Sequence, residues 1–108
     1  MIEPGLDRHE WESEWQALEE QLADAPTEAL GDVDDLVERM LEERGYSLDD
    51  AVAREGDDRE IVAEFLAARE IARLVEQGSE NVSPGDVAAA VNGYRAIFEY
   101  LIAERSAP

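Results

Sequence analysis

The chain has 108 residues and no cysteine, and its 28 acidic residues outnumber nine basic ones, for a formal net charge of -19. This length suits one domain, and a hydrophobic fraction of 44% supports a packed core rather than a disordered acidic tail. The absence of cysteine excludes disulfides, thiolate metal sites and cysteine nucleophiles.

The first predicted helix begins at Asp7, a good N-cap residue, and runs to about Asp24. Its apolar residues recur every three or four positions and therefore share one face. Pro26 interrupts this pattern, and Thr27 is the predicted cap of a second helix that ends near Gly45. The second helix carries an apolar stripe of its own, made of Leu30, Val33, Leu36, Val37, Met40 and Leu41.

A short helix is predicted over residues 47–54, and Gly56 separates it from a third long helix. Asp57 or Asp58 is expected to cap the third helix, and Gly78 is expected to end it. The run from Ser83 to Asp86 is the clearest start signal in the chain. It combines a capping serine, a proline at the first helical position and an acid in the first turn.

No segment alternates apolar and polar residues with the period of a strand. The sequence therefore predicts an all-α fold, a small antiparallel helical bundle of about four long helices plus one short helix. We expect a single domain over residues 1–108, with a flexible N-terminus at 1–6 and a frayed C-terminus at 106–108. No stretch is long and apolar enough to predict a membrane span, and no signal peptide is recognisable, so the expected location is the cytoplasm.

The charge balance has three interpretations. All nine basic residues are arginine, which is typical of a GC-rich genome. An acidic, lysine-free surface also suits a salty cytoplasm, and it suits a partner of opposite charge. The same charge disfavours direct binding to nucleic acid and to anionic membranes, because both would be repelled.

Catalytic and metal-binding patterns are weak. His9 is the only histidine and is expected to be an ordinary residue of the first helix rather than a general base. A di-iron site needs Glu-x-x-His pairs, which the chain lacks. Asp32, Asp34 and Asp35 do not fit a calcium loop, and we expect them to form a solvated face. No catalytic residue, cofactor or metal ligand is predicted.

Two groups of apolar residues are candidates for a protein interface. In the first helix, the indole side chains could instead anchor that helix to the bundle. In the last helix, the wide apolar stripe suits a buried central helix and a dimer interface equally well. The candidate residues are Trp11, Trp15, Tyr94, Ile97, Phe98, Leu101 and Ile102.

Three functions follow as expectations. The first is a non-enzymatic protein–protein interaction domain that associates with itself as a homodimer. The second is an acidic antagonist or regulatory partner, similar to an antitoxin, that covers a basic protein. The third is a carboxylate-rich helical metal-binding protein or enzyme.

Overall fold

The computed structural model describes residues 4–46 and 56–106, which form four long helices and no strand within those ranges. The helices are α1 (Pro4–Asp24), α2 (Pro26–Glu43), α3 (Gly56–Glu76) and α4 (Pro84–Ser106). The predicted all-α, antiparallel four-helix arrangement is thus confirmed. The predicted short helix at 47–54 lies outside the described residues, as do residues 1–3 and 107–108 of the expected loose termini.

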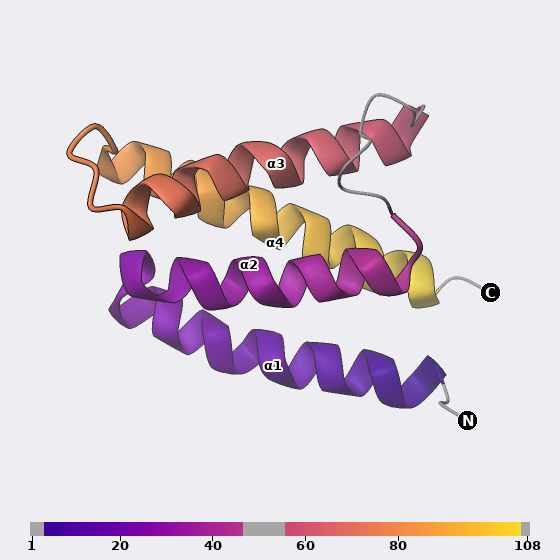
Figure 1. Cartoon of the computed structure of the whole chain (residues 1–108). Coiled ribbons are helices and arrows are strands. Elements are labelled where there is room, and N and C mark those ends of the chain that lie inside the picture. Colours follow the sequence, from indigo (N-terminus) through magenta and orange to yellow (C-terminus); the bar gives the residue numbers. More distant parts are fainter. Residues whose placement is uncertain (1–3, 47–55, 107–108) are drawn as a thin grey trace.

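Helix α2 occupies the middle of the molecule. It packs against α1, α3 and α4. The most extensive contact between any two helices is that of α3 with α4. In Figure 1, α1 and α3 lie on opposite sides of α2, and each helix runs antiparallel to the one before it. The first half of the chain is therefore an α1–α2 hairpin and the second half an α3–α4 hairpin, joined through α2 and α4.

Local backbone chemistry explains where these helices end. Both α2 and α3 are followed by a glycine with positive φ, +83° at Gly45 and +74° at Gly78. After α3, the amide of Ser79 donates to the carbonyl of Leu74 and that of Gly78 to the carbonyl of Val75, both at 3.0 Å. This is the Schellman motif. The residue that follows the helix has a left-handed backbone conformation, which only glycine adopts without strain.

The start of α4 is a reciprocal capping box. The amide of Asp86 donates to Oγ of Ser83, and the amide of Ser83 donates to Oδ2 of Asp86, both at 3.1 Å. Pro84 occupies the first helical position, where its missing N–H costs no hydrogen bond. The predicted cap at Ser83 is confirmed.

Three other predicted helix starts differ from the structure. Helix α3 begins at Gly56, so Asp57 and Asp58 lie inside it and neither is its cap. Helix α1 begins at Pro4, three residues before the predicted cap Asp7. Helix α2 begins at Pro26, so Thr27 lies inside the helix and Ala25 occupies the cap position without a side-chain hydrogen bond. The starts of α1 and α2 have one physical reason, since proline at the first helical position already has the φ angle that a helix requires.

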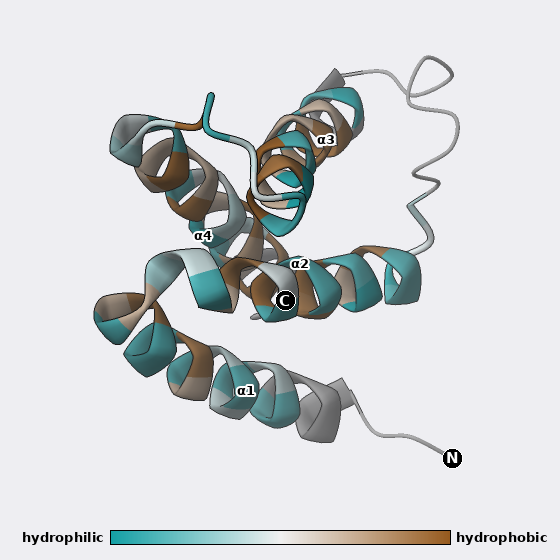
Figure 2. Cartoon of the chain, turned by 60° about the vertical axis from the view of Figure 1, so that its left-hand side comes forward, coloured by the Kyte–Doolittle hydropathy of each residue, from teal (hydrophilic) through white to brown (hydrophobic). Residues whose placement is uncertain are grey.

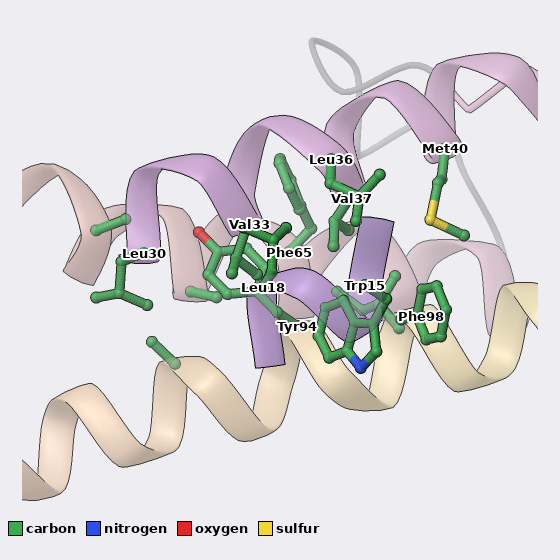
Figure 3. Close-up of a cluster of buried hydrophobic side chains, with 14 of the residues drawn as sticks. Trp15, Leu18, Leu30, Val33, Leu36, Val37, Met40, Phe65, Tyr94 and Phe98 are labelled. Atoms are coloured by element: carbon green, nitrogen blue, oxygen red, sulfur yellow. The ribbon is translucent and has the colours of Figure 1, made fainter. Parts of the chain in front are cut away.

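The core is one cluster to which all four helices contribute (Figure 3). Its largest completely buried side chains are Tyr94, Phe65, Leu30, Leu36, Leu41 and Ile97. Apolar segments turn mainly toward the interior in Figure 2, and hydrophilic ones outward. Within the described helices, none combines the length and apolar character that crossing a membrane requires.

Candidate functional site

Among the described residues, Asp34 is the one charged residue that is buried, and 7% of the surface of Asp34 is exposed. It lies on α2, among the apolar residues Val33, Leu36 and Val37. Its carboxylate accepts hydrogen bonds from Arg69 of α3, at 3.1 Å from Nε and 2.7 Å from Nη2. The hydroxyl of Tyr94 on α4 donates a further bond of 2.7 Å. One carboxylate thus joins three helices.

The guanidinium of Arg69 is held on several sides. Its Nη2 donates to Glu38 at 2.6 Å as well as to Asp34. Its Cζ lies 4.7 Å from the ring centroid of Phe65, one turn earlier on α3. The ring of Phe65 meets that of Tyr94 edge to face, with centroids 6.0 Å apart. A buried charge is tolerated only when it is paired and hydrogen-bonded, and both conditions are met here.

The pKa values follow from these contacts. The hydrogen bond to Asp34 raises the pKa of Arg69 above its ordinary value, so the guanidinium stays charged. Burial, followed by the neighbouring Asp34 carboxylate, raises the pKa of the Tyr94 hydroxyl, which therefore remains a hydrogen-bond donor. Near neutral pH, Arg69 is therefore a charged donor and Tyr94 a neutral one.

A polar cleft of about 260 Å³ opens between α2 and α3 beside this network. We call it the acidic cleft. Its charged lining consists of Asp32, Asp34, Asp35, Glu38 and Glu76, together with Arg69 and Arg73. Gly31 leaves room for the carboxylate of Glu76, because a Cβ at this position would lie 3.1 Å from Oε2 of Glu76. Carboxylates outnumber guanidinium groups in the lining.

Asp35 lies among other carboxylates in the acidic cleft. Its pKa is raised, first by burial and then by the neighbouring carboxylates of Asp34, Asp32 and Glu38. A raised pKa means that the ionised form is less favourable there than in water. A positive group placed beside Asp35 would relieve this repulsion, so the acidic cleft favours a cationic ligand over an anionic one.

Three of these carboxylates are close enough to share a cation. One oxygen each from Asp34, Asp35 and Glu38 lie within 4.8 Å of one another. However, Asp34 and Glu38 already accept hydrogen bonds from Arg69. A metal ion would have to compete with that guanidinium for the same oxygens, so the geometry is that of an ion-pair network.

Most of the candidate interface residues are buried in the core of the bundle. Trp15 stacks on Phe98 with ring centroids 4.6 Å apart and an interplanar angle of 10° (Figure 3). The five that lie in the core are Trp15, Tyr94, Ile97, Phe98 and Leu101. Their apolar character is therefore accounted for by packing between α4, α1 and the rest of the bundle.

Trp11 and Ile102 are only partly buried at the edge of the core. The guanidinium of Arg39 lies over the ring of Trp11, 5.7 Å from its centroid, and donates to Glu14 at 3.1 Å. His9 is exposed near Trp11. Trp11, Trp15 and the apolar residues of α4 thus do not form one surface.

The buried network of Asp34, Arg69 and Tyr94 was not predicted from the sequence. Asp34 was expected on a solvated face with Asp32 and Asp35, and for Asp34 this expectation was wrong. Its position carried the signal, because Leu30, Asp34, Val37 and Leu41 share helical spacing on one face. Arg69 likewise falls in the stripe between Phe65 and Ala72. Opposite charges in two apolar stripes predict an interhelical pair.

Comparisons with family models, with curated proteins and with solved structures gave no significant match to this chain. The roles of its residues are therefore argued from its own geometry.

Proposed function

We propose that this protein is a non-enzymatic interaction domain whose acidic surface binds a basic protein. The proposal rests on one observation, which is that the chain carries far more negative charge than its own arginines can neutralise. The chain has 28 acidic residues and nine arginines, so 19 negative charges stay uncompensated even if every arginine is paired. Complementary charge between two proteins accelerates their association and selects the partner.

The distribution of side chains supports this reading. Among the residues whose burial is described, Leu66 is the one large hydrophobic side chain classed as exposed, at 36%. The apolar stripes are used for folding, so the surface mainly presents charge to a partner. Three arginines are already bound by carboxylates of other helices: Arg39 by Glu14, Arg69 by Asp34, and Arg95 by Glu19.

The acidic cleft is the place where we expect the partner's cationic side chains to bind most tightly. Its carboxylates come from two helices, and the pKa of Asp35 is raised first by burial and then by repulsion from the neighbouring carboxylates. An arginine or lysine inserted between Asp35 and Glu76 would exchange that repulsion for charge-assisted hydrogen bonds. We place this binding in the cytoplasm, as expected from the sequence.

The experiment is affinity capture from a lysate of the native host, with elution at about 0.1 M and then about 1 M salt, where the screening length falls from about 10 Å to about 3 Å. The test variant is Asp32→Asn, Asp35→Asn and Glu76→Gln, which leaves both acid partners of Arg69 in place. The matched control is Glu20→Gln, Glu42→Gln and Glu43→Gln, which removes the same charge from exposed helical positions elsewhere.

We expect a basic protein to be retained by the wild type and the control, released by high salt, and largely lost from the cleft variant. Equal loss from both variants would reject the acidic cleft as the binding site. Capture that high salt does not reverse would contradict the electrostatic proposal itself.

The carboxylate-based enzyme or metal protein gains no support from a specific observation. The carboxylates that converge do so on Arg69, an arginine of the chain itself. We therefore do not put it forward as a second function.

A further inference from the structure

The outward face of α4 differs from the rest of the surface. Between Gly85 and Ala103 its exposed residues are Ala88, Ala89, Asn92 and Ala96, with Glu99 as the one charged side chain among them. On α2, by contrast, the exposed positions include six charged residues: Glu28, Asp32, Asp35, Arg39, Glu42 and Glu43. Among the described exposed positions of the four helices, those of α4 carry the fewest charged side chains.

An apolar groove of about 300 Å³ runs beside this face, between the first half of α4 and the last turns of α1. Leu22, Val87 and Val91 contribute to its apolar walls. The two charged residues in its lining, Glu19 and Arg95, form an ion pair of 3.1 Å and neutralise each other. The groove and the outward face of α4 share Ala88 and Asn92 and together form a surface of low net charge, which we call the α4 surface.

We propose that the α4 surface binds a second copy of this chain. Two copies of charge -19 repel each other wherever their acidic faces meet. Close approach is therefore favoured where each copy presents the least net charge, and the α4 surface meets that condition, with Glu99 as its one unpaired charge. A basic partner would instead gain nothing from this surface, because it offers no carboxylate beyond Glu99 and the neutralised Glu19.

The chemistry of α4 also selects an orientation. Closed dimers of identical chains have two-fold symmetry, in which the same surface faces itself. If the two copies of α4 were parallel, the two Glu99 side chains would lie opposite each other. An antiparallel pair centred between Asn92 and Ala96 separates the Glu99 side chains and opposes the two helix dipoles favourably. Alanine side chains allow such helices to approach closely.

This inference goes beyond the proposed function, and the two respond to salt with opposite signs. Added salt screens repulsion between two acidic copies and should strengthen the dimer, whereas it should weaken binding to a basic protein. Sedimentation velocity from micromolar to millimolar concentration, at about 0.1 M and about 1 M salt, measures the dimer directly. We expect a species of twice the 12.0 kDa chain mass, more populated at high salt.

The variant Ala96→Glu adds a charge at the centre of the α4 surface, and Ala17→Glu adds the same charge at an exposed alanine of α1. We expect Ala96→Glu to weaken dimerisation by about tenfold or more, which corresponds to about 1.4 kcal/mol. Ala17→Glu should have a much smaller effect. A wild type that is monomeric throughout, or a dimer that both variants affect equally, would overturn the inference.

A second measurement does not depend on weakening the dimer. Because the chain has no cysteine, a single cysteine can report proximity without background. Ala96→Cys should be linked to its symmetry mate by a short bifunctional thiol reagent, and Ala17→Cys should not. Crosslinking of Ala17→Cys in preference to Ala96→Cys would place the interface elsewhere and overturn the inference.

Discussion

The buried carboxylate of Asp34 shows how one residue can determine the packing of several helices. Apolar stripes pack in more than one register, because leucine, valine and alanine have no directional bonds. The bonds from Arg69 and Tyr94 are directional, and they reach Asp34 from α3 and from α4. An alternative register would leave a buried charge without partners, at a cost of several kcal/mol.

Removing the negative charge of Asp34 should therefore destabilise the folded protein. We expect Asp34→Asn to lower the free energy of unfolding by about 2–3 kcal/mol, because it leaves Arg69 half-buried with Glu38 as its remaining acidic contact. Urea unfolding followed by tryptophan fluorescence measures the change. The control is Asp35→Asn, an exposed neighbour whose raised pKa shows that its ionised form is not stabilised by folding. Equal effects of the two substitutions would contradict the assigned role of Asp34.

The ion pair between Glu19 and Arg95 should make a contribution to stability that depends on pH. The hydrogen bond from Arg95 lowers the pKa of Glu19 below the ordinary value of 4.5. A lowered pKa contributes stability above the unfolded-state value, and that contribution is lost as pH falls through the folded-state value. Wild type should therefore be more stable than Glu19→Gln at neutral pH, by less than about 1 kcal/mol because the pair is partly exposed. Below pH 4.5 the difference should shrink.

Urea unfolding at neutral and acidic pH tests this expectation. Glu20→Gln is the control, since it removes the same charge from an exposed neighbouring position. A difference between wild type and Glu19→Gln that does not change with pH would show that the Arg95 ion pair contributes nothing.

At the scale of the helices, the sequence was informative wherever local chemistry decides the outcome. Ser83 and Pro84 predicted the start of α4, and Gly78 the end of α3, because caps and left-handed glycines depend on a few adjacent residues. The starts at Pro4, Pro26 and Gly56 were not predicted, and at the first two a proline at the first helical position begins the helix in place of a side-chain cap.

The capping box provides a test at this scale. We expect Ser83→Ala to lower the free energy of unfolding by about 1 kcal/mol, because the amide of Asp86 loses its acceptor at the start of α4. Thermal unfolding followed by circular dichroism measures the loss. Ser13→Ala, at an exposed position within α1, is the matched control and should change stability by less than about 0.5 kcal/mol. Similar losses in both variants would mean that the cap is not stabilising α4.

What local patterns could not supply is the relation between helices. The last helix, with its wide apolar stripe, was the candidate for a central helix or an interface, yet α2 packs against all three others. The stacking of Trp15 on Phe98 joins residues 83 positions apart in sequence, a distance over which spacing rules carry no information. The interaction surfaces proposed above likewise depend on which faces remain outside after the bundle has formed.

At the scale of the whole molecule, the net charge of -19 affects stability as well as binding. Like charges on a compact surface repel each other more strongly than in the extended chain. We expect the melting temperature to rise as salt increases from about 0.01 M to about 1 M, because the screening length falls from about 30 Å to about 3 Å. A flat or falling melting temperature would show that the surface charges are already arranged favourably.

The most direct test of the central claim is the salt dependence of affinity for the captured basic protein. Titration of that protein into the wild type and the acidic-cleft variant, at several salt concentrations between about 0.1 M and about 1 M, gives the dissociation constant and its slope. We predict that the wild-type dissociation constant rises at least about tenfold across this range and that the cleft variant shows a smaller slope. A dissociation constant that does not change with salt would contradict an interaction based on the acidic surface.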